Sequence, residues 1–142
     1  MKKRTVLNLL FLALIISFFT TNLGYEAKIL LQRIFSSQVE FLSQDKQYTI
    51  DPDWTLKDRD NKQFPFTQSE GKVRFVYFFS SWRAMSIADL IGIDKLYQDY
   101  HDKVAFYIIT NELPQPVEQK QRDRKFTFKV TYLIQGVKMP FD

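Results

Sequence analysis

The fold of this chain is decided by the stretch Gly71-Lys72-Val73-Arg74-Phe75-Val76-Tyr77-Phe78-Phe79-Ser80-Ser81-Trp82. Its centre, residues 73–79, is a nearly continuous run of β-branched and aromatic side chains. Such a run predicts a strand that is buried on both faces, in the centre of a parallel sheet. Ser80 and Ser81 end the strand and can cap a helix that follows it.

Helix and strand patterns alternate after this strand. Residues 84–100 carry apolar side chains at steps of three and four, which predicts a helix. Residues 104–109 predict a second buried strand, and alternating side chains over 126–130 predict a third. A polar helix with a proline near its start is expected at 117–124. The order strand, helix, strand, helix, strand favours a right-handed parallel α/β unit.

A short hairpin is expected before the first long strand. Residues 54–57 alternate apolar and polar side chains, as a strand does, and residues 58–62 have the composition of a turn. Phe64 and Phe66 lie on either side of Pro65, which indicates an edge strand or an irregular segment.

The N-terminus has the pattern of a membrane anchor. Lys2, Lys3 and Arg4 precede an uncharged stretch, residues 5–23. A helix of about 19 residues reaches roughly 28 Å, close to the thickness of the hydrocarbon core. No small-x-small cleavage pattern follows, which favours an uncleaved single-pass anchor over a cleaved signal peptide. A buried core helix is a second alternative. The basic residues predict that the N-terminus lies inside the cytoplasm and that the rest of the chain lies outside it.

These patterns divide the chain into three parts. We expect a membrane anchor or signal segment at 1–24, a juxtamembrane helix and linker at 25–50, and a folded domain at 51–142. The domain would then lie in the periplasm or elsewhere in the cell envelope.

Composition excludes several classes of chemistry. The 142 residues include no cysteine and only one histidine, His101. Disulfide frameworks, Cys-ligated metal sites and thiol nucleophiles are therefore excluded, and multi-histidine metal sites are disfavoured. The net charge of +4 is not gathered on one face, so we expect no nucleic-acid partner. We also expect no cofactor and no bound metal.

Several segments together resemble one known family. The Gly-Lys-Val opening at Gly71 leads through an apolar strand and two serines to Trp82, and residues 54–58 with Asn61 and Lys62 form a W-x-L-x-D…N-K pattern. In this order they resemble the membrane-anchored, thioredoxin-like proteins of the TlpA and ResA type. The resemblance covers residues 51–142 and the anchor. It implies an α/β fold, a thioredoxin-like sheet with flanking helices, and a role in thiol–disulfide exchange.

The resemblance fails where that chemistry belongs. The family has Cys-x-x-Cys after the tryptophan, but here Trp82 is followed by Arg83-Ala84-Met85-Ser86. Arg83 and Ser86 thus stand at the two cysteine positions. Disulfide exchange needs a thiolate and a second sulfur, which neither residue supplies. His101 is expected about 22 Å from Ser86, at the far end of the same helix, so it cannot act as its base. We expect no catalytic residue among these degenerate positions.

Trp82, Arg83 and Met85 form a candidate docking surface for a peptide or protein. Each residue also has a plainer interpretation. Trp82 could pack over the start of the helix, Arg83 is more often a solvated side chain than an anion ligand, and Met85 is more often a helix contact than a soft metal ligand. Basic residues at 120–129 could meet lipid head groups, but a charged outer helix face is the favoured interpretation.

Two functions follow from these observations. The first is a membrane-tethered, redox-inactive thioredoxin-like domain that binds a peptide or protein. The alternative is a truncated or degraded member of the thiol–disulfide oxidoreductase family with no activity of its own, because the family continues with further strands and a helix. Such a shortened sheet is expected to leave an apolar edge.

Overall fold

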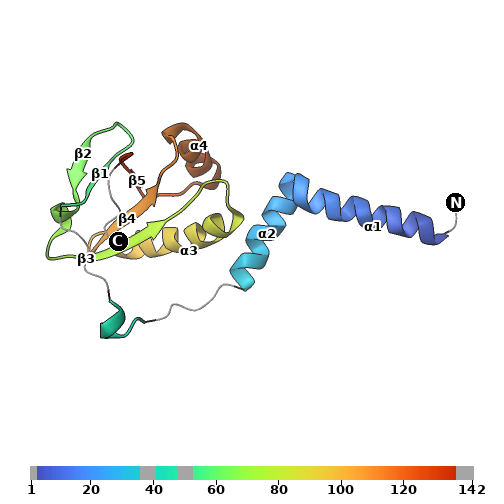
Figure 1. Cartoon of the computed structure of the whole chain (residues 1–142), viewed down its shortest axis with the longest axis horizontal. Coiled ribbons are helices and arrows are strands. Elements are labelled where there is room, and N and C mark those ends of the chain that lie inside the picture. Colours follow the sequence, from blue (N-terminus) through green and yellow to red (C-terminus); the bar gives the residue numbers. More distant parts are fainter. Residues whose placement is uncertain (1–2, 36–40, 48–52, 137–142) are drawn as a thin grey trace.

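The fold is a five-stranded mixed sheet with helices, preceded by two further helices at the N-terminus (Figure 1). The computed structural model describes residues 3–35, 41–47 and 53–136. The strand order is β2-β1-β5-β4-β3. The strands are β1 (Thr55–Lys57), β2 (Gln63–Pro65), β3 (Val73–Phe78), β4 (Val104–Thr110) and β5 (Val130–Tyr132).

The predicted parallel α/β unit is confirmed. β3 and β4 pair in parallel, as do β4 and β5. Helix α3 (Ala84–Tyr100) connects β3 to β4, and helix α4 (Pro114–Arg124) connects β4 to β5. The bounds of α3 match the predicted helix 84–100. The mixed α/β class and the sheet with flanking helices are therefore as the sequence predicts.

The position of β3 in the sheet differs from the prediction. β3 is the terminal strand among the described strands, and β4 has a partner on each side. Val73 is 72% exposed and Phe78 39%, whereas Ile108 and Ile109 of β4 are fully buried. The apolar composition of β3 comes from its two covered faces, because a run of side chains reports burial above and below a strand but not hydrogen bonding at its edges.

Two other boundaries also differ. The third parallel strand is β5, Val130–Tyr132, and not residues 126–130. The backbone of Thr127 donates to the Asp94 carboxylate at 2.6 Å, and the Phe128 carbonyl accepts from Gln121 at 2.9 Å, so these backbone groups bond to side chains. Helix α4 begins at Pro114 and not at Val117, since its first turn tolerates proline.

Each face of the sheet has its own hydrophobic cluster. On one face Ile87 and Leu90 of α3 share a cluster with Ile108 of β4. On the other face Trp54 and Phe66 pack with Ile109 of β4. The 3-10 helix η2 (Phe66–Ser69) supplies Phe66, directly after the short hairpin.

The hairpin β1–β2 forms as predicted, with antiparallel pairing between Leu56 and Phe64. The Asp58 carboxylate accepts hydrogen bonds from the backbone of Asp60 and Lys62, both at 2.9 Å. Asn61 takes the positive φ of 62° that its place in the turn requires.

Two helices precede the sheet. Helix α1 (Lys3–Thr20) has no buried residue within its described length, so the alternative of a buried core helix is wrong. It is long and apolar enough to span a membrane. Helix α2 (Asn22–Ile34) follows after Thr21 and packs against α3. The expected juxtamembrane and linker segment, 25–50, thus begins with a packed helix and continues through the exposed 3-10 helix η1 (Gln44–Lys46); residues 36–40 and 48–50 lie outside the described residues.

Candidate functional site

The candidate site lies on the loop that joins β3 to α3. The loop begins at Phe79, whose backbone still bonds to Ile109 of β4 at 2.9 Å, and it ends where α3 begins. Arg83 is the N-cap residue of α3 and its side chain makes no capping hydrogen bond. The carboxyl ends of the parallel strands β3 and β4 and the N-terminus of α3 therefore meet at the position of the degenerate motif.

Ser86 serves the local structure. It is 8% exposed, and its hydroxyl accepts a hydrogen bond from the backbone of Ser80 at 3.3 Å. One turn further along α3, Asp89 accepts a hydrogen bond from the Tyr77 hydroxyl at 2.7 Å. Burial raises the pKa of Tyr77, and the bond to the Asp89 carboxylate raises it further.

His101 is confirmed at the opposite end of the same helix. It is the C-cap residue of α3, and its ring lies 3.3 Å from the Asp102 carboxylate. Roughly 22 Å of helix separate it from Ser86. Ser86 and His101 therefore form no nucleophile–base pair.

Glu112 is a site residue that the sequence reasoning missed. Its carboxylate accepts hydrogen bonds from the backbone and the hydroxyl of Ser81, both at 2.5 Å. Glu112 follows β4 just as the motif loop follows β3, and parallel neighbours end at the same edge of the sheet. An acidic residue directly after the second buried strand was the signal that could have found it. The two bonds fix the loop immediately before Trp82.

The structure places Trp82 and Arg83 of the candidate docking surface in different clefts, and Met85 lines neither of the two. Trp82 is 71% exposed and lines a cleft of about 490 Å³ between the α1–α2 junction and α4. Arg83 and Ser86 line a second cleft of about 250 Å³ at the ends of β3 and β4. The Arg83 guanidinium lies 5.7 Å from the centre of the Trp82 ring, and Met85 is 52% exposed. The three predicted residues are thus close together but do not share one pocket.

The cleft beside Trp82 is lined by charged and aromatic side chains. Lys28 of α2 and Lys120 and Asp123 of α4 line it, and Lys120 lies 5.1 Å from the ring centre of Tyr25. The Tyr25 hydroxyl is 3.5 Å from the Ser81 carbonyl oxygen. Burial raises the pKa of Tyr25, although the nearby positive charge of Arg124 opposes the shift.

Part of the basic segment 120–129 is paired. The Arg124 guanidinium binds both oxygens of the Glu26 carboxylate, which joins α4 to α2. Arg122 lies 3.5 Å from Glu118 on the same helix. Arg122, whose side chain is 69% exposed, fits the charged outer helix face that the sequence favoured over contact with lipid head groups, whereas Arg124 lies on the side of α4 towards α2. Among residues 3–35, 41–47 and 53–136, no group of three or more metal-ligating side chains is placed to hold an ion.

No protein-family model matches the chain, and no curated protein matches it. Solved structures are similar to it. One, described as a protein disulfide isomerase from Bacteroides thetaiotaomicron, is 22% identical with a TM-score of 0.50, and the match covers 62% of this chain and 58% of that one. A thiol:disulfide interchange protein from Chlorobium tepidum is 22% identical with a TM-score of 0.45, covering 63% of each chain. The exposed lipoprotein thioredoxin Etrx1 of Streptococcus pneumoniae is 18% identical with a TM-score of 0.45, covering 59% of this chain and 67% of that one.

The chain spans less than two thirds of the length of the first two of these structures. At such low identity the likeness concerns the fold alone. The first of these structures and the five-stranded mixed sheet with its flanking helices agree in fold class. The chain therefore has a thioredoxin-like fold.

Proposed function

We propose that the chain is a membrane-tethered thioredoxin-like domain that binds a peptide or protein and does not exchange disulfides. The chain contains no cysteine, and Arg83 and Ser86 occupy the positions that the family resemblance gives to the two catalytic sulfurs. Ser86 is also buried and bonded to the backbone of Ser80. Without a thiolate and a resolving thiol, the mixed disulfide of the exchange reaction can neither form nor be released.

The exposure of large apolar side chains on the loop and at the start of α3 carries the binding role. Trp82 on the loop is 71% exposed, Met85 in the first turn of α3 is 52% exposed, and the Arg83 guanidinium lies 5.7 Å from the centre of the Trp82 ring. The Glu112 carboxylate holds the loop through its two hydrogen bonds to Ser81. Because the loop is already ordered, binding a partner there costs little backbone conformational entropy. Tryptophan and arginine are the side chains that most often dominate binding energy at protein interfaces.

The N-terminal helix supports the cellular location. α1 is long and apolar enough to span a membrane, and Lys3 and Arg4 lie at its N-terminal end. By the positive-inside rule these residues remain in the cytoplasm. The domain then lies on the outer side of the membrane, in the cell envelope.

Two measurements on the full chain in detergent test this function. In an insulin-reduction assay we expect no turnover, and any turnover would refute the redox-inactive assignment. For binding, random peptides displayed on phage are selected on the purified chain. We expect selected peptides to bind at least tenfold more weakly to Trp82→Ala and Met85→Ala. Tyr100→Ala is the matched control, because Tyr100 is also an exposed aromatic residue but lies at the far end of α3 from the loop. Peptides that bind all variants equally, or a selection that yields none, would contradict the binding role.

A further inference from the structure

Helix α2 has two apolar faces, and only one of them is covered by the domain. Ile29 is 3% exposed and belongs to the cluster that includes Ile87 and Leu90 of α3. A second face, roughly 100–140° around the helix from Ile29, carries Leu23, Leu30 and Ile34, which are 79%, 58% and 67% exposed. Residues at steps of seven and four lie on one side of a helix. The described part of the chain therefore leaves an exposed apolar stripe along α2.

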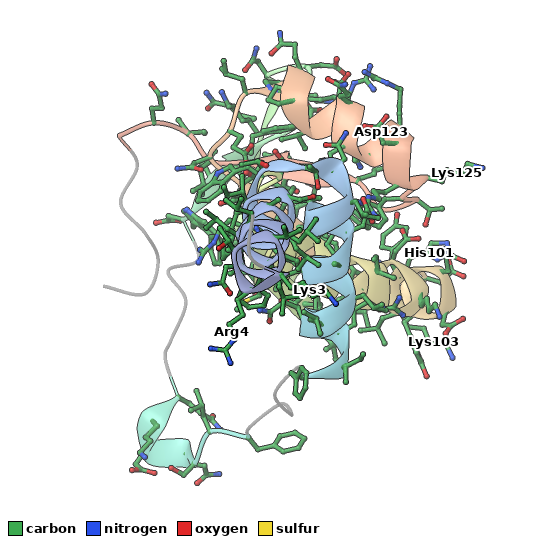
Figure 2. The ribbon with its side chains drawn as sticks, turned by 90° about the vertical axis from the view of Figure 1, so that its right-hand side faces the viewer. Lys3, Arg4, His101, Lys103, Asp123 and Lys125 are labelled. Carbon is green, nitrogen blue, oxygen red and sulfur yellow. The ribbon has the colours of Figure 1, made fainter. Side chains whose placement is uncertain are left out.

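Helix α1 leaves the end of α2 on the side away from the sheet (Figure 1). Figure 1 shows α1 running away from the domain from the upper end of α2, and α2 lies between α1 and the sheet. Figure 2 looks nearly along α1, with Lys3 and Arg4 towards the viewer and α2 running across the view in front of the domain. If α1 crosses a bilayer, the membrane surface lies at the end of α1 where α2 begins. Because α2 turns sharply away from the direction of α1, it would then run along that surface.

The junction between the two helices is fixed by local contacts. The Thr21 hydroxyl donates to the Ser17 carbonyl at 2.7 Å and accepts from the backbone of Gly24 at 3.1 Å. A Cβ atom on Gly24 would lie 2.0 Å from the carbonyl oxygen of Phe18, so only glycine permits this close approach. These contacts hold α2 at a set angle to α1.

Polar and aromatic groups at the junction suit the head-group region. The Lys28 ammonium lies 5.3 Å and 4.5 Å from the ring centres of Phe18 and Phe19, near the end of α1. Lys28, Lys120 and the exposed Trp82 all line the cleft beside this junction. Tryptophan and lysine side chains are typical of membrane–water interfaces.

We propose that α2 lies in the membrane–water interface, with Leu23, Leu30 and Ile34 in contact with lipid. The bilayer covers the apolar stripe, while Ile29 on the other face holds the domain. The domain is then fixed against the membrane, with the Trp82 loop near the lipid head groups. A domain joined to its anchor only by a flexible linker would have no fixed position of this kind. This assignment rests on the proposed anchoring by α1 and adds the position of the domain.

Spin labels on single cysteines test the assignment, because the natural chain contains no cysteine to interfere. The full chain is reconstituted in nanodiscs of phosphatidylglycerol and phosphatidylcholine. Labels are placed at Leu30→Cys and Ile34→Cys on the stripe, at Leu12→Cys on α1, and at Lys103→Cys on an exposed turn after α3. Collision with oxygen reports lipid, and collision with a water-soluble nickel chelate reports solvent.

We expect the ratio of oxygen collisions to nickel collisions at Leu30 and Ile34 to be at least threefold higher than at Lys103. The label at Leu12 gives the ratio of a site in lipid, and the label at Lys103 gives that of a site in solvent. A solvent-like ratio at Leu30 and Ile34 with a lipid-like ratio at Leu12 would overturn the position of α2 and leave the anchor intact. A solvent-like ratio at Leu12 as well would refute the anchor itself. Protection of Leu30 and Ile34 from both reagents would show that protein, such as a second copy, covers the stripe, and would overturn the proposal too.

Discussion

Replacing Ile29 by alanine measures whether α2 belongs to the folded domain. Ile29 is 3% exposed and packs into the cluster on the α3 side of the sheet. The substitution removes three carbon atoms, which at about 0.8 kcal/mol each is roughly 2.4 kcal/mol of lost burial. A residual cavity adds to this loss, because buried Ile→Ala substitutions cost about 2–5 kcal/mol. We therefore expect the free energy of unfolding to fall by at least about 2 kcal/mol.

The assay is thermal unfolding of the full chain in mild detergent, followed by tryptophan fluorescence. Trp54 is 3% exposed and reports loss of the core. In a domain of this size about 1 kcal/mol shifts Tm by roughly 4–8 °C, so Ile29→Ala should lower Tm by about 8 °C or more.

Leu30→Ala is the matched control, since it lies on the same helix, removes the same number of carbons and starts from a side chain that is 58% exposed. We expect it to change stability by less than about 0.5 kcal/mol. Equal effects of the two substitutions, or no effect of Ile29→Ala, would refute the packing of α2 on the domain.

Three further predictions concern the junction, the loop after α4 and the titration of the core. Gly24→Ala should force α1 and α2 apart at the carbonyl of Phe18, and a pair of spin labels across the junction should show a longer and broader distance distribution. Asp94→Ala should remove a buried carboxylate that accepts hydrogen bonds from the backbone and the hydroxyl of Thr127, and should cost about 1.5–3 kcal/mol by denaturant unfolding, whereas an unchanged midpoint would contradict those bonds. Burial raises the pKa of Tyr132 from 10.0 to about 12, so the unfolded state releases this proton first and stability should fall as pH rises from about 10 to 12. In Tyr132→Phe that alkaline loss should be smaller, as measured by Tm against pH.

Local patterns predicted most of the elements, and tertiary contacts account for the errors. Helix α3 was predictable to the residue because its apolar side chains recur at steps of three and four, but the predicted serine cap is wrong, since Arg83 is the N-cap residue. Strand β5 was misplaced because Asp94 and Gln121 bind the backbone of Thr127 and Phe128. Asp94 lies 33 residues before Thr127, so the local pattern around Thr127 does not reveal this bond, and local propensity yields to it.

The candidate site was predictable in part for the same reason. Trp82, Arg83 and Met85 were identifiable because they adjoin the strongest strand in the chain. Glu112 lies 31 residues after Ser81 in sequence, and only the parallel pairing of β3 with β4 brings its carboxylate to the loop. The division of the surface into two clefts likewise depends on α2 and α4, which pack around the loop from distant parts of the chain.

The sequence by itself determined the apolar N-terminal helix, the alternation of strands and helices, and the absence of cysteine from the motif after Trp82. Each of these is a property of residue type or short-range spacing. Only the tertiary structure decided that β3 is the terminal strand among those described, that α2 packs on α3, and that Leu23, Leu30 and Ile34 of α2 stay exposed. The physical reason is that the period of a pattern shows which side chains share a face, but only packing against other elements shows what that face meets.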